Sequence, residues 1–414
     1  MSTGALVRIE HLGGEGDGIG TLDGRRLAVP LTCPGDLVAV GRHTGSGRLA
    51  RELAWRLVEA APRRPPQCPH RDACGGCVVQ HLPEPVYRAF KQARVAEPLV
   101  RQGVDPAVIA PVVASPPGSR RRARLAWTIR RGRVTLGFRE RRGRAVVDLE
   151  ACAVLRPALV ALLPGLRELA AATGAPLGEA VLSETATGID VLLVSDAEIG
   201  WSRRERLAAI AGAAGLARLS LGPAAAPEPL VTHATPRVTL SGHAVAIPPG
   251  AFLQATAEGE AALVDAVRGW LDLPGPVADL YAGCGTFALA LLERGPVRAF
   301  ERDAAALDAA RRAAHGRLAV EVRDLDRQPL SAEELRGFAA VVLDPPHRGA
   351  AAQIPTLASA PGPVRIAYVS CHPGSFARDV AGLAAGGWRL VRVVPVDQFL
   401  WSAEIELVGL LERR

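Results

Sequence analysis

The chain is poor in aromatic residues and in lysine, and it has no long apolar run. Only 4% of its 414 residues are aromatic, and Lys91 is the only lysine among 49 basic residues. No apolar run approaches the roughly 18–20 residues of a membrane helix, and the N-terminus lacks a basic segment followed by a long apolar one. We therefore expect a soluble, cytoplasmic monomer with no membrane partner.

Acidic residues are scarce in one arginine-rich segment. The formal net charge is +7, which is compatible with a polyanionic partner such as RNA. Between Arg120 and Arg144 there are 11 arginines and a single acid, Glu140. Because arginine is abundant throughout the chain, this clustering is more informative than the total. It predicts an RNA-contacting surface, with a solvated strand face as the alternative.

The cysteines do not fit a disulfide framework. There are seven of them, and an odd number without a secretory signal argues against paired bridges. The spacing Cys68-x5-Cys74-x2-Cys77, followed later by Cys152, predicts a site with four thiolate ligands instead. Such a set suits either structural zinc or an iron–sulfur cluster, and spacing alone is compatible with both.

The hydrophobic pattern divides the chain into three parts. Residues 1–62 contain short strands with turns, which predict a small barrel of the oligonucleotide-binding kind. Residues 63–245 mix strand-like and helical runs and predict an α+β domain. Residues 246–414 alternate strand and helix, so we expect an α/β domain with a parallel sheet. Two final strands, 388–396 and 404–411, have no helix between them, which is typical of the Rossmann-like class I methyltransferase architecture.

A glycine turn follows the first strand of the last domain. The strand-like run ends at Tyr281, and Gly283 and Gly285 allow a tight turn and close approach to a ligand. Glu301 ends the next strand and is placed to accept bonds from ribose hydroxyls. Asp324 follows the third strand and is a candidate partner for an adenine amino group. Each acid alone could be a surface carboxylate, but the spaced set predicts a nucleotide-cofactor site.

A cysteine and a glutamate form a candidate catalytic pair. Cys371 lies between an apolar strand and a helix, where we expect a lowered thiol pKa; simple packing is the alternative. Glu406 lies in an alternating strand, where the alternative is the solvated face of an edge strand. A thiolate adding to carbon 6 of uracil makes carbon 5 nucleophilic, and a base must later remove the carbon 5 proton. Asp344 ends another strand and would lie beside the methyl donor.

Together these motifs resemble the RNA 5-methyluridine (uridine-C5) methyltransferases, most of all the bacterial 23S rRNA enzymes with a TRAM barrel. The resemblance covers nearly the whole chain, including CPHRDACGGCVVQH, AFLQAT, DLYAGCGTF, LDPP, YVSCHP and the C-terminal PVDQFLWSAEIELVGLL. It implies Cys371 as nucleophile, Glu406 as base, and a 4Fe–4S cluster on Cys68, Cys74, Cys77 and Cys152. It also implies S-adenosyl-L-methionine as cofactor, bound by Gln254, Tyr281, Gly283, Gly285, Thr286, Glu301, Asp324 and Asp344.

The chain departs from the family pattern at several positions. The family usually has Asn at the positions of Thr256 and His372, Arg at that of His347, and His at that of Glu404. These changes leave the thiol and the base intact but affect substrate positioning. We expect 23S rRNA as the substrate. The alternatives are a tRNA uridine-C5 enzyme, a cytosine-C5 enzyme, and an RNA-binding iron–sulfur protein that has lost catalysis.

Overall fold

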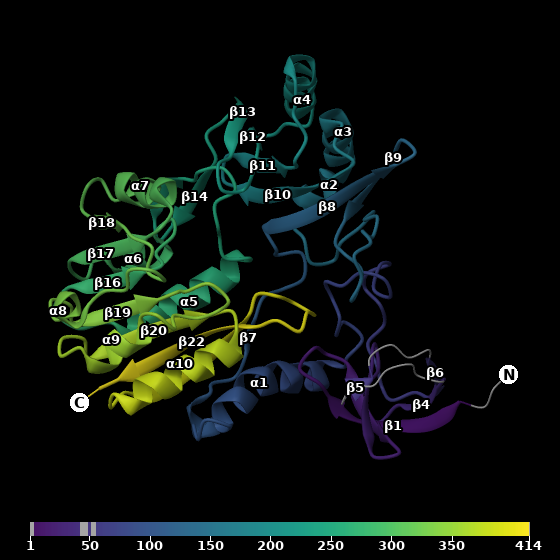
Figure 1. Cartoon of the computed structure of the whole chain (residues 1–414), viewed down its shortest axis with the longest axis horizontal. Coiled ribbons are helices and arrows are strands. Elements are labelled where there is room, and N and C mark those ends of the chain that lie inside the picture. The colour runs from purple at the N-terminus through teal and green to yellow at the C-terminus, as the bar shows by residue number, and fades with distance from the viewer. Residues whose placement is uncertain (1–3, 42–48, 51–54, 414) are drawn as a thin grey trace.

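The computed structural model describes residues 4–41, 49–50 and 55–413. Within this part of the chain, three large sheets follow one another along the sequence (Figure 1). In the view of Figure 1 the N-terminal sheet lies at the lower right, the central sheet at the top, and the C-terminal sheet at the left. Among the described residues, no helix combines the length and the apolar character needed to cross a bilayer.

The N-terminal sheet has six strands in the order β5-β3-β2-β1-β4-β6. Alternate residues of its strands, such as Val7 and Ile9, point into a small apolar core with Leu27, Val29 and Val38. The sheet matches the expected short strands, while a closed barrel stays a prediction. The strands are β1 (Ala5–Leu12), β2 (Gly18–Leu22), β3 (Arg25–Val29), β4 (Leu37–Val40), β5 (Leu49–Ala50) and β6 (Trp55–Glu59).

The central sheet has the order β13-β12-β11-β10-β8-β9, and α3 and α4 pack together beside it. After β9, Val146 forms an isolated bridge with Arg139. A two-stranded hairpin, β14–β15, follows. The elements are β8 (Arg122–Arg130), β9 (Arg133–Gly137), α2 (Pro157–Ala161), α3 (Leu163–Thr173), β10 (Leu177–Thr185), β11 (Gly188–Val194), α4 (Trp201–Ala213), β12 (Arg218–Leu221), β13 (Glu228–Thr232), β14 (Arg237–Leu240) and β15 (His243–Ala246).

The C-terminal sheet has eight strands in the order β18-β17-β16-β19-β20-β22-β21-β7. The strands from β18 to β20 are parallel, and β22 runs antiparallel between β20 and β21. This confirms the expected parallel sheet with a final antiparallel hairpin. The strands are β16 (Val277–Leu280), β17 (Val297–Glu301), β18 (Ala319–Val322), β19 (Ala340–Leu343), β20 (Arg365–Ser370), β21 (Arg389–Asp397) and β22 (Glu406–Glu412).

The strand order predicts a ligand-binding crevice at one edge of this sheet. The chain runs outward from β16 to β18 and then returns to β19 on the other side of β16. Crevices form at the carboxyl ends of strands where the order reverses in this way. The helices around the sheet are α5 (Ala257–Trp270), α6 (Thr286–Leu291), α7 (Ala304–Ala313), α8 (Ala332–Leu335), α9 (Ile354–Ser359) and α10 (Pro373–Ala385).

One segment ahead of the central sheet packs on the C-terminal sheet. Helix α1 (Glu84–Val100) lies against α10 and β21, with Val95 and Leu99 in the same apolar core as Phe376. The short helix η1 (Pro106–Val108) follows it, and β7 (Val113–Ala114) then pairs in parallel with β21 as the edge strand. The domain limits 1–62, 63–245 and 246–414 therefore stay a prediction. The segment from α1 to β7 lies within the predicted range 63–245 but packs on the sheet of the range 246–414.

Candidate catalytic site

The two glycines of the turn after β16 have different surroundings. Gly283 has a φ of +53° and Gly285 a φ of +87°, and Tyr281 also has a positive φ, of +64°. A Cβ on Gly285 would lie 2.8 Å from the Cβ of Ala310, so this glycine permits close packing against α7. A Cβ on Gly283 would meet no atom within 4 Å. The turn is therefore open to a ligand at Gly283 and closed at Gly285.

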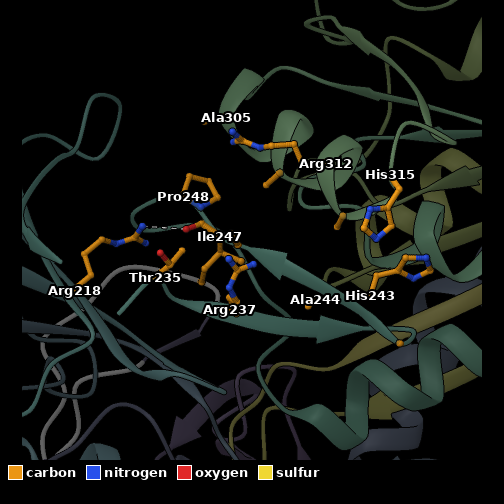
Figure 2. A pocket seen from close by; sticks show the side chains of 14 residues that line it. Arg218, Thr235, Arg237, His243, Ala244, Ile247, Pro248, Ala305, Arg312 and His315 are labelled. Carbon is orange, nitrogen blue, oxygen red and sulfur yellow. Dashed lines mark hydrogen bonds between the residues drawn. The ribbon is translucent and has the colours of Figure 1, made fainter. Parts of the chain in front are cut away.

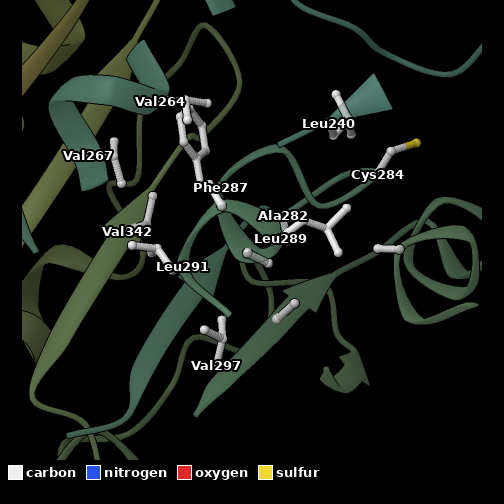
Figure 3. Packing of buried hydrophobic residues seen from close by; sticks show 14 of the residues in the cluster. Leu240, Val264, Val267, Ala282, Cys284, Phe287, Leu289, Leu291, Val297 and Val342 are labelled. Atoms are coloured by element: carbon white, nitrogen blue, oxygen red, sulfur yellow. The ribbon is translucent and has the colours of Figure 1, made fainter. Parts of the chain in front are cut away.

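The turn rests on a core that includes Cys284. Figure 3 shows this side chain near Leu240, on the side of the cluster away from Phe287 and Val264. Burial raises the pKa of the Cys284 thiol to about 12. The residue packs in the core and is not poised as a nucleophile.

Two acids lie at the ends of the neighbouring strands. Glu301, at the end of β17, accepts hydrogen bonds from the backbone N–H groups of Gly283 at 3.1 Å, Arg302 at 2.7 Å and Asp303 at 2.8 Å. Asp324 follows β18 and accepts the N–H of Asp326 at 3.1 Å. Both carboxylates are partly exposed. The structure thus brings the predicted acids to the same sheet edge as the glycine turn, and Thr286 begins α6 directly after that turn.

Cys371 and Glu406 meet across two paired strands. Ser370, the last residue of β20, pairs with Leu407 of β22. The next positions in this antiparallel register are Cys371 and Glu406, and side chains at directly opposite positions point to the same face. Glu406 is only 3% exposed, and Cys371 is partly buried. The alternative of a solvated edge strand for Glu406 is wrong, because β22 lies inside the sheet.

A chain of side-chain amides links the glutamate to the other expected residues. The Nε2 group of Gln398 donates to Glu406 Oε2 at 2.8 Å and to Gln254 Oε1 at 2.7 Å. Gln254 Nε2 in turn donates to Asp344 Oδ2 at 3.4 Å. Gln398 Oε1 accepts the backbone N–H of Ala255 at 2.8 Å, which fixes the orientation of its amide. The amides therefore hold two carboxyl groups in one buried array.

The pKa of the Cys371 thiol differs from the value expected from the sequence. Burial, together with the carboxylates of Glu406 and Asp344, raises the pKa of the Cys371 thiol to about 12. The lowered pKa expected for a thiol at a strand end was therefore wrong, because desolvation and two nearby acids outweigh the helix terminus. Burial and Asp344 also raise the pKa of Glu406, to about 8. Burial and Glu301 raise the pKa of Asp344 in the same direction.

Sequence reasoning missed two members of this site. Asp279 lies inside β16, fully buried, and its Oδ2 accepts the N–H of Ala288 at 2.8 Å. Its other oxygen has no hydrogen-bond partner among the described residues. An aspartate within an apolar strand was the available signal. Gln398 gave no such signal, because its role depends on partners 144 and 8 residues away.

Two departures from the family pattern act as helix caps. Thr256 Oγ1 accepts the N–H of Gly259 at 3.0 Å at the start of α5. His372 Nδ1 accepts the N–H of Ser375 at 2.9 Å at the start of α10. The ring of His372 also lies 4.1 Å from that of His347, measured between centroids. Both imidazoles line a cavity of about 420 Å³ that reaches Gly13 and Gly14 of the N-terminal part.

The four cysteines of the expected cluster are free thiols. Burial raises the pKa of Cys77, and Cys152, Cys74 and Cys68 raise it too, so the four side chains lie near one another. Among the described residues, however, no group of three or more His, Cys, Asp or Glu side chains is arranged to hold a metal ion. Four thiols are the kind of ligand set that an iron–sulfur cluster needs. Their arrangement in the described residues does not form a metal site.

Another cavity, of about 820 Å³, lies away from the thiol and the amide chain. Arg237 and His243 of the β14–β15 hairpin face Arg312 and His315 of the α7 region across it (Figure 2). Its lining contains no acid, but Arg312 pairs with Asp308 at 2.8 Å. The cavity shares no residue with the catalytic array and gives no sign of the reaction.

Comparison with known proteins identifies the family. An uncharacterized RNA methyltransferase of Rhizobium meliloti is 39% identical over 434 aligned positions, covering 100% of both chains. The chain belongs to the RNA methyltransferase family. The 23S rRNA (uracil(1939)-C(5))-methyltransferase RlmD of Pseudomonas putida is 34% identical, covering 98% of this chain and 92% of its own. This RNA methyltransferase is thus related over 98% of its length to a uracil-C5 enzyme.

A solved structure supports the fold. The Pyrococcus abyssi tRNA (uracil-54, C5)-methyltransferase in complex with S-adenosyl-L-homocysteine superposes with a TM-score of 0.72. It is 24% identical and covers 98% of this chain and 100% of its own. This confirms a Rossmann-like methyltransferase fold. No family model matches the sequence.

Proposed function

We propose that this RNA methyltransferase methylates carbon 5 of a uridine in 23S rRNA, with S-adenosyl-L-methionine as methyl donor. The observation that supports it most is the meeting of Cys371 and Glu406 at opposite register positions of β20 and β22. A thiol and a base on one face are what carbon 5 alkylation of uracil requires. The relative at 34% identity, named for 23S rRNA, favours rRNA over tRNA.

The residues of the turn suit the proposed donor. The open space at Gly283 can admit a ligand close to the backbone, and Glu301 and Asp324 present carboxylate oxygens for ribose and adenine. Gln254, Tyr281, Gly285, Thr286 and Asp344 complete the proposed binding residues. When bound, S-adenosyl-L-methionine supplies an electrophilic methyl group and a positive charge.

The chain's own residues carry the remaining chemistry. The Cys371 thiol gives up its proton to water, the resulting thiolate adds to carbon 6 of the uracil, and the electron pair of the 5,6 double bond becomes available at carbon 5. After carbon 5 is methylated, Glu406 takes its proton, the double bond re-forms, and the thiolate leaves. A pKa near the working pH suits this base, because the carboxylate is then available and still basic.

We further propose that Cys68, Cys74, Cys77 and Cys152 hold a 4Fe–4S cluster. Support comes from four free thiols, of which Cys68, Cys74 and Cys152 lie close enough to Cys77 to act on its pKa. Burial raises that pKa most, and Arg120 opposes the rise. Methyl transfer requires no redox step, so the proposed role is to shape the RNA-contacting region. Anaerobically purified protein should show the broad visible absorption of a cluster, whereas stoichiometric zinc without iron would contradict the assignment.

The test of the proposed function uses Cys371→Ala. This variant should bind S-adenosyl-L-methionine normally by calorimetry and transfer no methyl group to an unmodified 23S rRNA transcript. Retained turnover would remove Cys371 from the mechanism. Mapping of 5-methyluridine in rRNA and tRNA from a strain lacking the protein identifies the substrate, and a loss confined to tRNA would overturn the rRNA assignment.

A further inference from the structure

The only lysine of the chain lies beneath the segment that carries the proposed base. Lys91, on α1, is fully buried, and so is its partner Asp397 at the end of β21. The Lys91 Nζ group donates to Asp397 Oδ1 at 2.7 Å and to the carbonyl oxygen of Phe399 at 3.2 Å. It also donates to the carbonyl oxygen of Glu404. An ammonium group has three donors, so all three are used.

These bonds span the connection between β21 and β22. Residues 398–405 leave the sheet after Asp397 and return at Glu406, and Lys91 contacts the chain near both ends of this loop. Tyr87, one turn earlier on α1, adds two more contacts. Its hydroxyl donates to Asp397 Oδ2 and accepts the backbone N–H of Trp401 at 2.9 Å. Helix α1 therefore holds the loop at its start, middle and end.

The loop carries the residues that orient the base. Gln398, directly after Asp397, donates to Glu406 at 2.8 Å and to Gln254 at 2.7 Å. Glu404 is two residues before Glu406, and its carbonyl is one of the acceptors of Lys91. A shift of this loop would therefore move both the amide that holds Glu406 and the point where β22 begins.

The composition of the chain supports a specific need for lysine. The chain has 49 basic residues, and all but Lys91 are arginine. A guanidinium is planar and presents its donors in a rigid fork, whereas an ammonium can reach three acceptors that converge on one point. Three convergent acceptors in a fully buried site thus require the side chain that the sequence otherwise lacks.

We propose that Lys91 is a positioning residue for the proposed base: with Tyr87 and Asp397 it holds the 398–405 loop so that Glu406 faces the Cys371 adduct. This inference rests on the proposed function. Displacement of the base should slow proton removal more than adduct formation. Covalent RNA–enzyme adduct on ordinary uridine should therefore accumulate when Lys91 is replaced.

The experiment compares Lys91→Met, Lys91→Arg and Tyr87→Phe with Arg101→Met. Arg101 is an exposed residue that directly follows α1 and pairs with Glu97. The readouts are kcat and KM for an unmodified 23S rRNA transcript, denaturant-resistant adduct at steady state, and S-adenosyl-L-methionine affinity. Lys91→Met and Lys91→Arg should lower kcat roughly 10- to 100-fold, as small displacements of catalytic groups do. Both should raise the adduct fraction and leave cofactor affinity within about twofold. Arg101→Met should match the wild type.

Glu406→Gln, measured in parallel, separates the two proposals. Adduct accumulation in Glu406→Gln with none in the Lys91 variants or Tyr87→Phe would overturn the positioning role alone. Absence of adduct in Glu406→Gln itself would overturn the proposed function. If Lys91→Met loses cofactor binding together with its fold, Tyr87→Phe decides the question, because it removes contacts to the same loop and leaves the ion pair in place. Full activity of Lys91→Arg would refute the specific need for lysine.

Discussion

Replacement of Glu406 by glutamine should stabilise the folded chain at alkaline pH while abolishing turnover. The carboxyl group is 3% exposed and lies near Asp344, and these two conditions raise its pKa from 4.5 to about 8. A glutamine at this position can still accept the hydrogen bond from Gln398 but carries no charge to bury. The same substitution removes the proposed acceptor of the carbon 5 proton.

The sign and size of the effect follow from proton linkage. Because the pKa of Glu406 is higher in the folded than in the unfolded chain, the folded chain binds more protons between about pH 4.5 and pH 8. The contribution of protonated Glu406 to stability is therefore fully present below about pH 4.5 and is lost as the pH rises to about 8. One pKa unit corresponds to about 1.4 kcal/mol, so ionised Glu406 destabilises the folded chain by a few kcal/mol.

The assay is the Tm of wild type and Glu406→Gln at pH 6 and pH 9. The Tm of the variant should rise relative to that of the wild type as the pH rises, so the Tm difference should be larger at pH 9 than at pH 6. Glu412→Gln is the matched control on the same strand, because Glu412 pairs with Arg365 at 2.9 Å and is about one-third exposed. It should change stability by less than about 1 kcal/mol at either pH. A Tm difference that is independent of pH would refute the reasoning.

Two further predictions concern the glycine turn and the N-terminal sheet. Gly283→Ala should weaken S-adenosyl-L-methionine binding about tenfold or more by calorimetry, since its methyl group would enter the open space. Gly285→Ala should instead cost about 1–3 kcal/mol of stability, because its Cβ would lie 2.8 Å from that of Ala310. Asp36 is fully buried and accepts two hydrogen bonds from Arg63. Asp36→Asn should therefore destabilise the N-terminal sheet by about 3 kcal/mol, measured by hydrogen exchange.

Local patterns were sufficient for much of the C-terminal domain. The apolar run before Cys371 and the alternating strand around Glu406 are both visible in the sequence, and they form the paired strands β20 and β22. Glu301 was likewise predicted from its place after an apolar run, and it contacts the N–H of Gly283. Strands of a parallel sheet end at a common edge, so their order along the chain is enough to bring such residues together.

Long-range pairing was not accessible in the same way. The edge strand β7 pairs Val113 with Val396, and α1 packs on α10, yet no local period marks either contact. The pKa of Cys371 also depends on Glu406 and Asp344, which are distant in sequence, so a thiol judged by its own helix was given the wrong sign. Lys91 was visible as a compositional exception, but its acceptors Asp397 and Phe399 lie more than 300 residues away in the sequence.

The acids of the catalytic edge act against one another. Burial raises the pKa of Asp279, Glu406 and Asp344 most; Asp344 adds to the rise for Asp279 and Glu406, and Glu301 adds to that for Asp344. Carboxyl groups gathered in this way cost folding free energy and are characteristic of functional sites. The positive sulfonium of the proposed donor would offset their repulsion, whereas the neutral thioether left after methyl transfer would not. The same carboxylates that destabilise the folded chain would therefore bind the sulfonium donor more tightly than the neutral thioether product. This difference would favour replacement of the product by a new donor molecule.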